Sequence, residues 1–409
     1  MKPMWTDKFS KADWIDKERV TNYPRMLVVM YVIAIILVLA TSRDMIDFSG
    51  KNIGTDFMDV WSAGKMALEK QPAEVYDYQK HMDVQKAALP WPLVKDGKPF
   101  QVPFYGWHYP PVFLMVAAAL AFFPYGLSLL VWVAVTLPAY LAAIRAILPR
   151  REALMAALAF PGVFVTLGHG QNGFLTAGLF GGALVLLEKR PYVAGVLFGL
   201  MCYKPQLGVL IPLALLCCGC WRAIFSAGLT VVLASALSCI LFGVETWQAF
   251  IDSFGLTRTV VLEAGSTGWE KIQSIFSAVR LLGGGVELAY AAQGIFALVA
   301  AGAVIWVWRS KAGMELKSAA LVTASLMVTP YVLDYDLVLL ALPVAWIAAL
   351  GLRSGFLPWE KITLFSVFVL PLLSRMLGQY LHIPVAPLVM VGLLWVVVRR
   401  VNIKAARAL

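Results

Sequence analysis

The stretch MLVVMYVIAIILVLA, residues 26–40, contains no charged residue. A helix needs about 20 mainly apolar residues to cross a bilayer, and the candidate segment 26–46 meets that length. The preceding residues, 1–25, are polar and mixed in charge, and no small-residue cleavage site follows the apolar run. We therefore expect a retained membrane helix here rather than a cleaved signal peptide.

The rest of the chain is similarly apolar. Of the 409 residues, 60% are hydrophobic and 14% are charged, whereas a soluble domain has roughly 25% charged residues. The mean hydropathy is +0.76. The candidate membrane segments are 26–46, 109–123, 127–147, 153–169, 171–187, 191–204, 205–221, 222–243, 286–308, 317–331, 335–351, 361–378 and 383–400. We therefore predict an all-α integral membrane protein.

The net charge of +10 comes from lysines and arginines in the two tails and between the apolar segments. Such residues collect in the short cytoplasmic loops of membrane proteins, so nucleic acid is not an expected partner. If segment 109–123 crosses fully, the later basic loops fall on the outer side. If 109–147 makes one net crossing, with 109–123 re-entrant or on the surface, they all fall inside. We therefore predict about 12 transmembrane helices with both termini cytoplasmic.

This topology defines the expected organisation. Residues 1–25 form a cytoplasmic N-terminal segment, and residues 26–409 form a single transmembrane domain with extracytoplasmic loops 47–108 and 244–285. The five cysteines lie in or beside apolar segments, outside the large loop, so we expect no disulfide framework. Cys217 and Cys220 have CxxC spacing, but no second pair exists, and small apolar residues at a helix end explain them.

The first candidate for chemistry is Asp56, in Gly54-Thr55-Asp56-Phe57 just beyond the first membrane helix. A carboxylate there can act as a general base on a sugar hydroxyl. It can equally cap a helix, since Asp is a favoured N-cap residue. Asp59 lies one helical turn further on and is a weaker candidate, and Trp61 follows it.

Three further motifs lie between apolar segments on the predicted outer face. His108 and Tyr109 precede Pro110-Pro111, where aromatic residues would suit the membrane interface in any case. Lys204 is a lysine at membrane depth, where an ionisable group suggests function, although snorkelling to the interface is the alternative. His169 and Gln171 lie in a glycine-rich break that is also typical of a turn.

The last candidates are Asp334 and Asp336, which follow Pro330 in an apolar context. Two nearby carboxylates could bind a sugar or a metal, or could simply form an interfacial loop. A metal would need more oxygen ligands, so we expect no metal and no cofactor.

Taken in order, the motifs GTDF, WSAG, HYPP, GHGQN, YKPQ and PYVLDYDLVLLALP resemble glycosyltransferase family 87. This family belongs to the GT-C superfamily and includes bacterial polyprenyl-phosphate-mannose-dependent alpha-mannosyltransferases. The resemblance covers roughly residues 50–350. The family pattern often has a histidine in the late motif, where this chain reads Leu333-Asp334-Tyr335.

The resemblance implies a GT-C multi-pass bundle in the bacterial inner membrane, with juxtamembrane helices in a large first extracytoplasmic loop. It implies transfer of a sugar, with mannose expected, from a polyprenyl-phosphate donor to a glycolipid or glycan acceptor outside the membrane. Asp56 would be the base of an inverting reaction. For the donor phosphate we expect Lys204, His108 and Tyr109, with Arg258 and Lys271 as weaker candidates. For the acceptor or sugar we expect Asp59, Trp61, His169, Gln171, Asp334 and Asp336.

Two other functions remain open from the residues alone. A transporter or flippase of lipid-linked sugars would not need Asp56. A lipid-linked glycan ligase or polymerase would also have a large outer loop, but such enzymes usually carry many arginines there, and this loop has few.

Overall fold

The long apolar segments form long helices, as predicted. The computed structural model describes residues 9–88, 94–95, 98–99 and 105–406. Within these ranges, seven helices are long and apolar enough to cross a membrane by length and composition. They are α2 (Lys17–Thr41), α6 (Tyr125–Ile147), α13 (Trp221–Phe242), α17 (Val286–Arg309), η4 with α19 (Asp334–Leu340 and Ala341–Ser354), α20 (Glu360–Leu381) and α21 (Val385–Ala406).

The remaining apolar segments are broken into shorter helices. They are α7 (Arg151–Ala159), α8 (Pro161–His169), α9 (Gly173–Leu186), α10 (Pro191–Leu200), η2 (Met201–Tyr203), α11 (Pro205–Gly208), α12 (Leu210–Cys217) and α18 (Met314–Val328). Helices α7 and α8 together could make one span bent by 52°, because Pro161 lacks the backbone N–H that would continue helix α7. Seven spans, or eight with this pair, establish a multi-pass membrane protein, and the number twelve stays a prediction.

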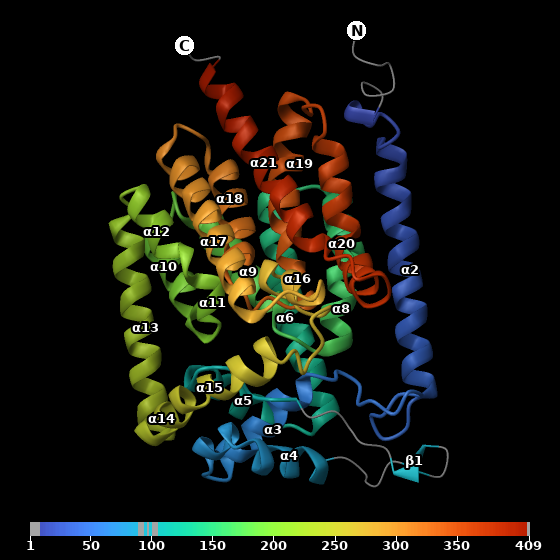
Figure 1. Ribbon diagram of the computed structural model, residues 1–409, viewed down its shortest axis with the longest axis vertical. Coiled ribbons are helices and arrows are strands. Elements are labelled where there is room, and N and C mark those ends of the chain that lie inside the picture. Colours follow the sequence, from blue (N-terminus) through green and yellow to red (C-terminus); the bar gives the residue numbers. More distant parts are fainter. Residues whose placement is uncertain (1–8, 89–93, 96–97, 100–104, 407–409) are drawn as a thin grey trace.

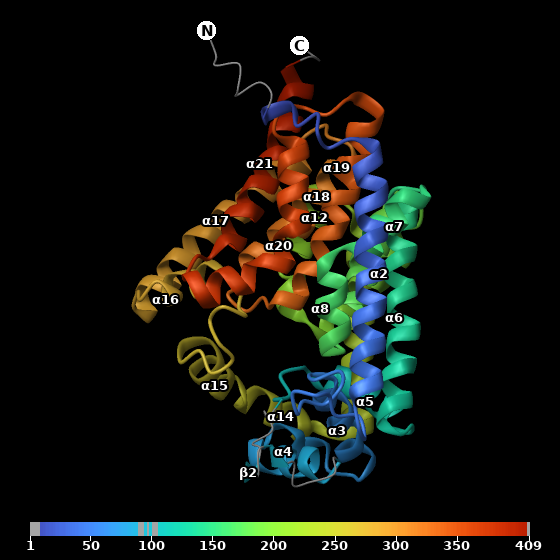
Figure 2. The same ribbon diagram turned by 90° about the vertical axis from the view of Figure 1, so that its right-hand side faces the viewer.

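Both polar loops fold into short helices. The first contains α3 (Phe57–Leu68), η1 (Pro72–Tyr76), α4 (Tyr78–Ala87) and the small antiparallel pair β1 (Val94–Lys95) and β2 (Lys98–Pro99). The second contains α14 (Val244–Asp252), α15 (Phe254–Leu256), the π-helix η3 (Thr257–Glu263) and α16 (Ile275–Leu281). Helices α3, α4 and α14 form a layer under the bundle (Figures 1 and 2), which we call the distal layer.

Helix α5 (Pro111–Ala121) joins the distal layer to the bundle. Its 11 residues span only about 16 Å at 1.5 Å per residue, about half of a hydrocarbon core roughly 30 Å thick. The helix packs against α3 so closely that a Cβ on Gly64 would lie 2.1 Å from the carbonyl oxygen of Ala117. A helix this short fits the predicted re-entrant or surface segment better than a full crossing.

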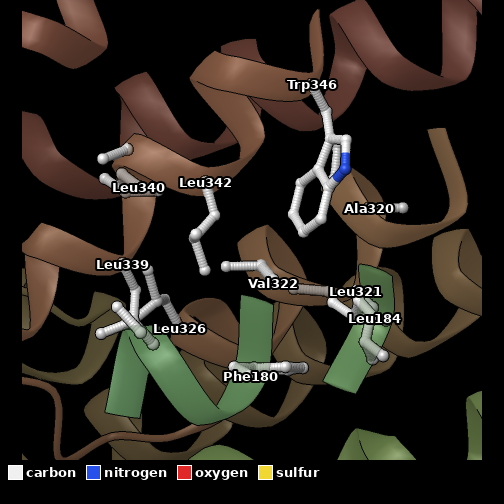
Figure 3. Close-up of a cluster of buried hydrophobic side chains, with 14 of the residues drawn as sticks. Phe180, Leu184, Ala320, Leu321, Val322, Leu326, Leu339, Leu340, Leu342 and Trp346 are labelled. Carbon is white, nitrogen blue, oxygen red and sulfur yellow. The ribbon is translucent and has the colours of Figure 1, made fainter. Parts of the chain in front are cut away.

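The centre of the bundle is a core of branched and aromatic side chains. Phe180 and Leu184 from α9 meet Leu321 and Val322 from α18 and Trp346 from α19 (Figure 3). The segment η4–α19 is 83% buried over its most apolar window, whereas the corresponding value for α2 is 6%. Helix α2 therefore lies at the periphery, and η4–α19 is the central element to which the site is attached.

The two ends of the chain lie at the same end of the molecule, opposite the distal layer (Figure 1). The backbone N–H of Trp359 donates to the carbonyl oxygen of Ser10 at 2.6 Å, and Lys361 Nζ donates to that of Ile15 at 3.3 Å. The N-terminal segment is thus attached to the connection between α19 and α20.

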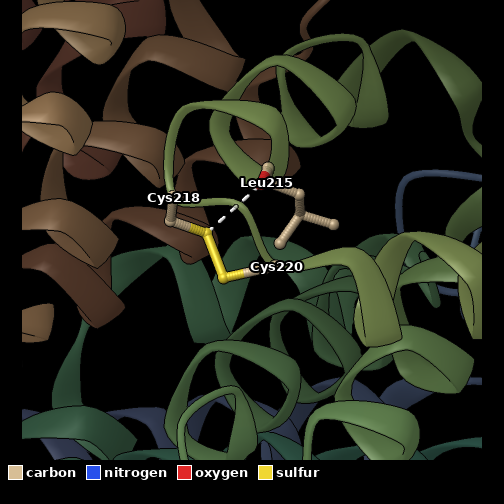
Figure 4. Close-up of a disulfide and its surroundings, with 3 residues drawn as sticks. All are labelled: Leu215, Cys218 and Cys220. Atoms are coloured by element: carbon tan, nitrogen blue, oxygen red, sulfur yellow. Dashed lines mark hydrogen bonds between the residues drawn. A yellow bond between two sulfur atoms is a disulfide. The ribbon is translucent and has the colours of Figure 1, made fainter.

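One expectation about the cysteines is wrong. Cys218 and Cys220 form a disulfide after α12, and the sulfur of Cys218 lies 3.3 Å from the carbonyl oxygen of Leu215 (Figure 4). Gly219 between them has a φ of +65°, and this tight turn brings the two Cα atoms within 5.4 Å. The CxxC pair itself is not bridged, since Cys217 has a free thiol.

The α3–α5 contact makes a testable prediction about stability. Gly64→Ala should destabilise the protein by about 1–3 kcal/mol, the usual cost of overpacking, because the new methyl group would collide with backbone atoms of α5. Gly228→Ala in α13 is the control, because nothing lies within 4 Å of a Cβ there. Thermal unfolding in detergent, followed by tryptophan fluorescence, measures both, and equal melting temperatures would contradict the packing described here.

Candidate active site

Asp56 lies at the turn that leads into α3. Gly54, with a φ of +71°, opens the turn, and the N–H of Phe57 donates to the Gly54 carbonyl oxygen at 2.7 Å. Asp56 occupies the N-cap position, but its side chain makes no capping hydrogen bond. The helix-capping alternative for Asp56 is therefore excluded, and its carboxylate points to groups outside α3.

The partners of this carboxylate come from the break between α8 and α9. His169 Nδ1 lies 3.4 Å from Asp56 Oδ1, and Gln171 Nε2 donates to Asp56 Oδ2 at 3.0 Å. Thr55 Oγ1 donates to Oδ1 at 3.2 Å and lies 2.8 Å from His169 Nδ1. The two predicted polar motifs, GTDF and GHGQN, thus meet at one carboxylate.

Glycine makes this meeting sterically possible. Gly170 ends α8 with a φ of +62°, and a Cβ at this position would lie 2.6 Å from the Cβ of Phe57. Trp132 Nε1 donates to the Gly170 carbonyl oxygen at 3.1 Å. The break between α8 and α9 is therefore pressed against the start of α3, with His169 and Gln171 on either side of the contact.

The charge state of Asp56 follows from these neighbours. Burial by itself would raise the pKa of Asp56, but attraction to His169 and the hydrogen bond with it, attraction to Lys271, and the hydrogen bond from Gln171 outweigh burial. The pKa of Asp56 is therefore lower than its ordinary value of 3.8. Asp56 is an ionised acceptor at neutral pH.

Asp59 has a different environment. Its side chain is 5% exposed, and its Oδ1 lies 3.8 Å from Nε2 of His81, which itself is 2.7 Å from Ser62 Oγ. Burial, followed by repulsion from Asp56, raises the pKa of Asp59, and burial lowers the pKa of His81 to about 3. His81 is therefore neutral at neutral pH, and Asp59 lies buried inside the distal layer beside it.

Lys204, expected at the donor phosphate, is buried inside the bundle. It is 3% exposed, and its ammonium group donates to Asp336 Oδ1 and, at 3.0 Å, to Asn172 Oδ1. It also lies 5.0 Å from the centre of the Tyr335 ring. Asp336 is 1% exposed, so the positive charge of Lys204 is compensated inside the protein.

The two residues of the HYPP motif differ in their contacts. His108 Nδ1 lies 3.0 Å from Thr257 Oγ1 in the second polar loop, and burial lowers the pKa of His108 to about 4. Its imidazole is thus neutral at neutral pH. Tyr109 Oη donates to Gln171 Oε1 at 3.1 Å, so this residue lies directly behind the partners of Asp56.

The remaining predicted residues are distributed over two regions. Asp334 is 3% exposed in its side chain and pairs at 3.5 Å with Arg375 of α20, and its N–H donates to the carbonyl oxygen of Lys271 at 3.0 Å. Lys271 is thereby placed near Asp56, which it attracts. Arg258 pairs instead with Glu263 at 3.3 Å and is 65% exposed.

Trp61 packs edge-on against Tyr125, with the ring centres 5.8 Å apart, and its Nε1 donates to the carbonyl oxygen of Phe123 at 3.0 Å.

Sequence reasoning missed three residues of this site. Thr55 and Asn172 lay inside motifs that had already been singled out, beside Asp56 and Gln171. Arg375 lay in the apolar segment 361–378, and the rule that ionisable groups at membrane depth are functional candidates would have identified it. In the described part of the chain, no group of three or more His, Cys, Asp or Glu side chains is placed to hold a metal ion.

The long apolar helices define a multi-pass membrane protein, and the partly exposed carboxylate of Asp56 is its candidate site. The model of glycosyltransferase family 87 matches residues 107–330, which is more than half of the chain. The protein belongs to glycosyltransferase family 87 and is a membrane glycosyltransferase. No curated protein and no solved structure matches the chain.

The buried His81 predicts a dependence of stability on pH. Its folded-state pKa of about 3 lies below its ordinary value of 6.5, so the unfolded chain takes up the proton first as the pH falls. The free energy of unfolding therefore falls as the pH is lowered from about 6.5 to 3, by roughly 1.4 kcal/mol for each pH unit in that window. When the pH is lowered from neutral towards that range, the melting temperature of His81→Gln should fall less than that of the wild type.

The exposed His382 provides the control, since His382→Gln should behave as the wild type does. The raised pKa of Asp59 acts in the opposite direction, but Asp59 is present in all three proteins, so the comparison isolates His81. Identical acid destabilisation of wild type and His81→Gln would show that His81 is not held neutral in the fold.

Proposed function

We propose that the protein moves a sugar, with mannose the first candidate, from a polyprenyl-phosphate donor to a glycolipid or glycan acceptor. The reaction inverts the anomeric centre and uses Asp56 as the general base. The observation that carries this proposal is the environment of Asp56, an ionised carboxylate held by His169 and Gln171 and still 14% exposed in its side chain.

The other acidic candidates are less suited to the role of base. The side chains of Asp59, Asp334 and Asp336 are 5%, 3% and 1% exposed, and each lies beside a basic side chain. Among these four predicted acids, all within the described ranges, Asp56 has the most accessible side chain. A single accessible carboxylate favours a single displacement over a route through a covalent sugar–enzyme intermediate, which would need a nucleophile as well as a base.

In the proposed chemical step one bond forms, one bond breaks and one proton moves. The acceptor oxygen forms a bond to the anomeric carbon, the bond between that carbon and the phosphate oxygen breaks, and Asp56 takes the acceptor proton. Polyprenyl phosphate leaves with the bonding electrons and gains one negative charge. No metal or other cofactor enters this scheme.

The growing charge on the phosphate needs a stabilising group, since this is often the largest contribution to catalysis. Lys271 is the favoured candidate, because it lies close enough to Asp56 to attract it. Lys204 is compensated by Asp336, and Arg258 is paired with Glu263. His108, which carries no charge at neutral pH, would act as a hydrogen-bond partner of the donor. The Tyr109 hydroxyl is already used between Asn172 and Gln171, so we assign it no contact with the donor.

The proposed location of the reaction is the extracytoplasmic face of the bacterial inner membrane. The distal layer lies at the end opposite the two termini (Figure 1), and the tails are rich in lysine and arginine, as expected of the cytoplasmic side. Membership in a glycosyltransferase family disfavours the transporter or flippase, which breaks no glycosidic bond. A lipid-linked glycan ligase or polymerase is distinguished by its donor, which would be a lipid-linked glycan.

Loss of the base predicts a loss of turnover. Asp56→Asn keeps the size of the side chain but removes its basicity, and we expect kcat to fall at least about 100-fold. Transfer of labelled mannose from polyprenyl-phosphate-mannose to a membrane lipid extract measures it, with Asp83→Asn, an exposed aspartate of the same loop, as the control. Full transfer by a folded Asp56→Asn protein would refute the base assignment, whereas a wild type active only with another sugar would refute mannose.

Removal of Lys271, the cation proposed to stabilise the donor phosphate, should weaken use of the donor. Lys271→Met should lower kcat/KM for the donor about three- to fivefold, the size expected of a partly exposed ion pair worth roughly 1 kcal/mol, without changing the KM for the acceptor. Lys51→Met, in the first loop, is the control because Lys51 is exposed. Unchanged donor kinetics in Lys271→Met would shift the phosphate to another part of the site.

A further inference from the structure

The buried pair of Lys204 and Asp336 is connected to Asp56 by consecutive hydrogen bonds. Lys204 Nζ donates to Asn172 Oδ1 at 3.0 Å, and Asn172 Nδ2 donates to Tyr109 Oη at 2.8 Å. Tyr109 Oη donates to Gln171 Oε1 at 3.1 Å, and Gln171 Nε2 donates to Asp56 Oδ2 at 3.0 Å. We call these residues the positioning chain.

The hydrogen bonds of the positioning chain all donate in one direction, from Lys204 towards Asp56, and Lys204 fixes the direction of the first one. An ammonium group has three N–H donors and no acceptor, so the amide of Asn172 must turn its oxygen towards Lys204 and its NH₂ towards Tyr109. The Tyr109 hydroxyl, which accepts from Asn172, has a single proton and gives it to Gln171. The amide of Gln171 must then turn its NH₂ towards Asp56.

Asp336 fixes the other end of the chain. Its Oδ1 accepts from Lys204, and its Oδ2 accepts the backbone N–H of Leu333 at 3.1 Å. Both side chains are nearly fully buried, at 3% and 1% exposed. A buried ion pair contributes little net stability compared with apolar side chains of the same size, so stability alone does not account for this one.

We infer that Lys204 and Asp336 are positioning residues, which orient the Gln171 amide through Asn172 and Tyr109 so that it donates to Asp56. This inference rests on the proposed role of Asp56 as the base. The backbone N–H of Asn172 also donates to Gln171 Oε1, at 3.3 Å. Without the charge at Lys204, the Asn172 amide can reverse, and this longer contact alone then holds the Gln171 oxygen away from the carboxylate. The hydrogen bond to the ionised form of Asp56 would weaken, so its titration would move to higher pH.

His169 from α8 and Lys271 from the second loop also act on the titration of Asp56, and the variants leave both in place. The variants also leave in place the other titratable groups that interact with Asp56, which are Asp59 from α3, Tyr105, Tyr125 from α6, Tyr331, and Tyr335 from η4. A change of titration in variants of the positioning chain therefore reports on the chain.

The test measures the titration of Asp56 without any substrate. Water-soluble carbodiimide reacts with protonated carboxyl groups, and peptide mass spectrometry gives the pH at which labelling of Asp56 is half-maximal. The double variant Lys204→Met/Asp336→Asn removes both charges together, and we expect its midpoint to rise by at least about one pH unit. Tyr109→Phe breaks the chain in the middle with almost no change in volume, and its midpoint should rise in the same direction if the double variant does not fold.

Two comparisons separate positioning from a general effect on the fold. Arg400 and Glu360 form a second buried ion pair, 5% and 1% exposed in their side chains, and Arg400→Met/Glu360→Gln should leave the midpoint of Asp56 unchanged. In a Gln171→Leu background, the Lys204→Met/Asp336→Asn change should cause no further change of the midpoint, because the link is already broken. Additive changes in this mutant cycle would overturn the inference.

The outcomes also distinguish this inference from the proposed function. An unchanged midpoint in both Lys204→Met/Asp336→Asn and Tyr109→Phe overturns the inference, whatever the transfer assay gives. A raised midpoint together with full transfer by Asp56→Asn would overturn only the assignment of Asp56 as base. In the transfer assay, the positioning variants should lower kcat and raise the pH of the acid limb, with the KM for the donor unchanged.

Discussion

The close contact between the turn at Gly170 and the turn at Gly54 is the constraint on which the site depends. A side chain at Gly170 would collide with Phe57 and approach the Cα of Gly54 to 3.4 Å, so the two backbones can meet only because glycine is present. The contact joins the end of α8 to the start of α3, and it places His169 and Gln171 against opposite oxygens of Asp56. The geometry around Asp56 and the attachment of the distal layer therefore have the same origin.

Charge compensation in the apolar bundle explains why Asp56 stands apart. The buried acids Asp334, Asp336 and Glu360 each have a basic partner within the protein, as is required where water cannot solvate a charge. Asp56 is held by His169, Gln171 and Thr55, and its side chain stays partly exposed. It is therefore the acid best suited to the proposed role of base, because the fully paired acids would first have to break an ion pair.

The sequence predicted the helical membrane class well, because apolar segments of about 20 residues have few alternatives. It also identified GTDF and GHGQN as polar motifs on one face, which the structure brings together. Hydropathy could not predict where the chain breaks: segment 205–221 is divided into α11 and α12, and proline and glycine within an apolar run leave its mean hydropathy almost unchanged. Partners were equally beyond reach, because no pattern along the chain pairs Lys204 with Asp336 or Asp334 with Arg375.

The short apolar helices have a consequence for the surrounding bilayer. Helix α10 with η2 and helix α11 with α12 form the short apolar stretches Pro191–Tyr203 and Pro205–Cys217, so each covers about 20 Å of depth, whereas α13 beside them has 22 residues. Thinning of the hydrocarbon next to this side of the bundle, or entry of water, would relieve this mismatch. A long isoprenoid with a charged head group would meet a lower barrier to reaching the depth of the polar groups there than along the flanks formed by the full-length helices.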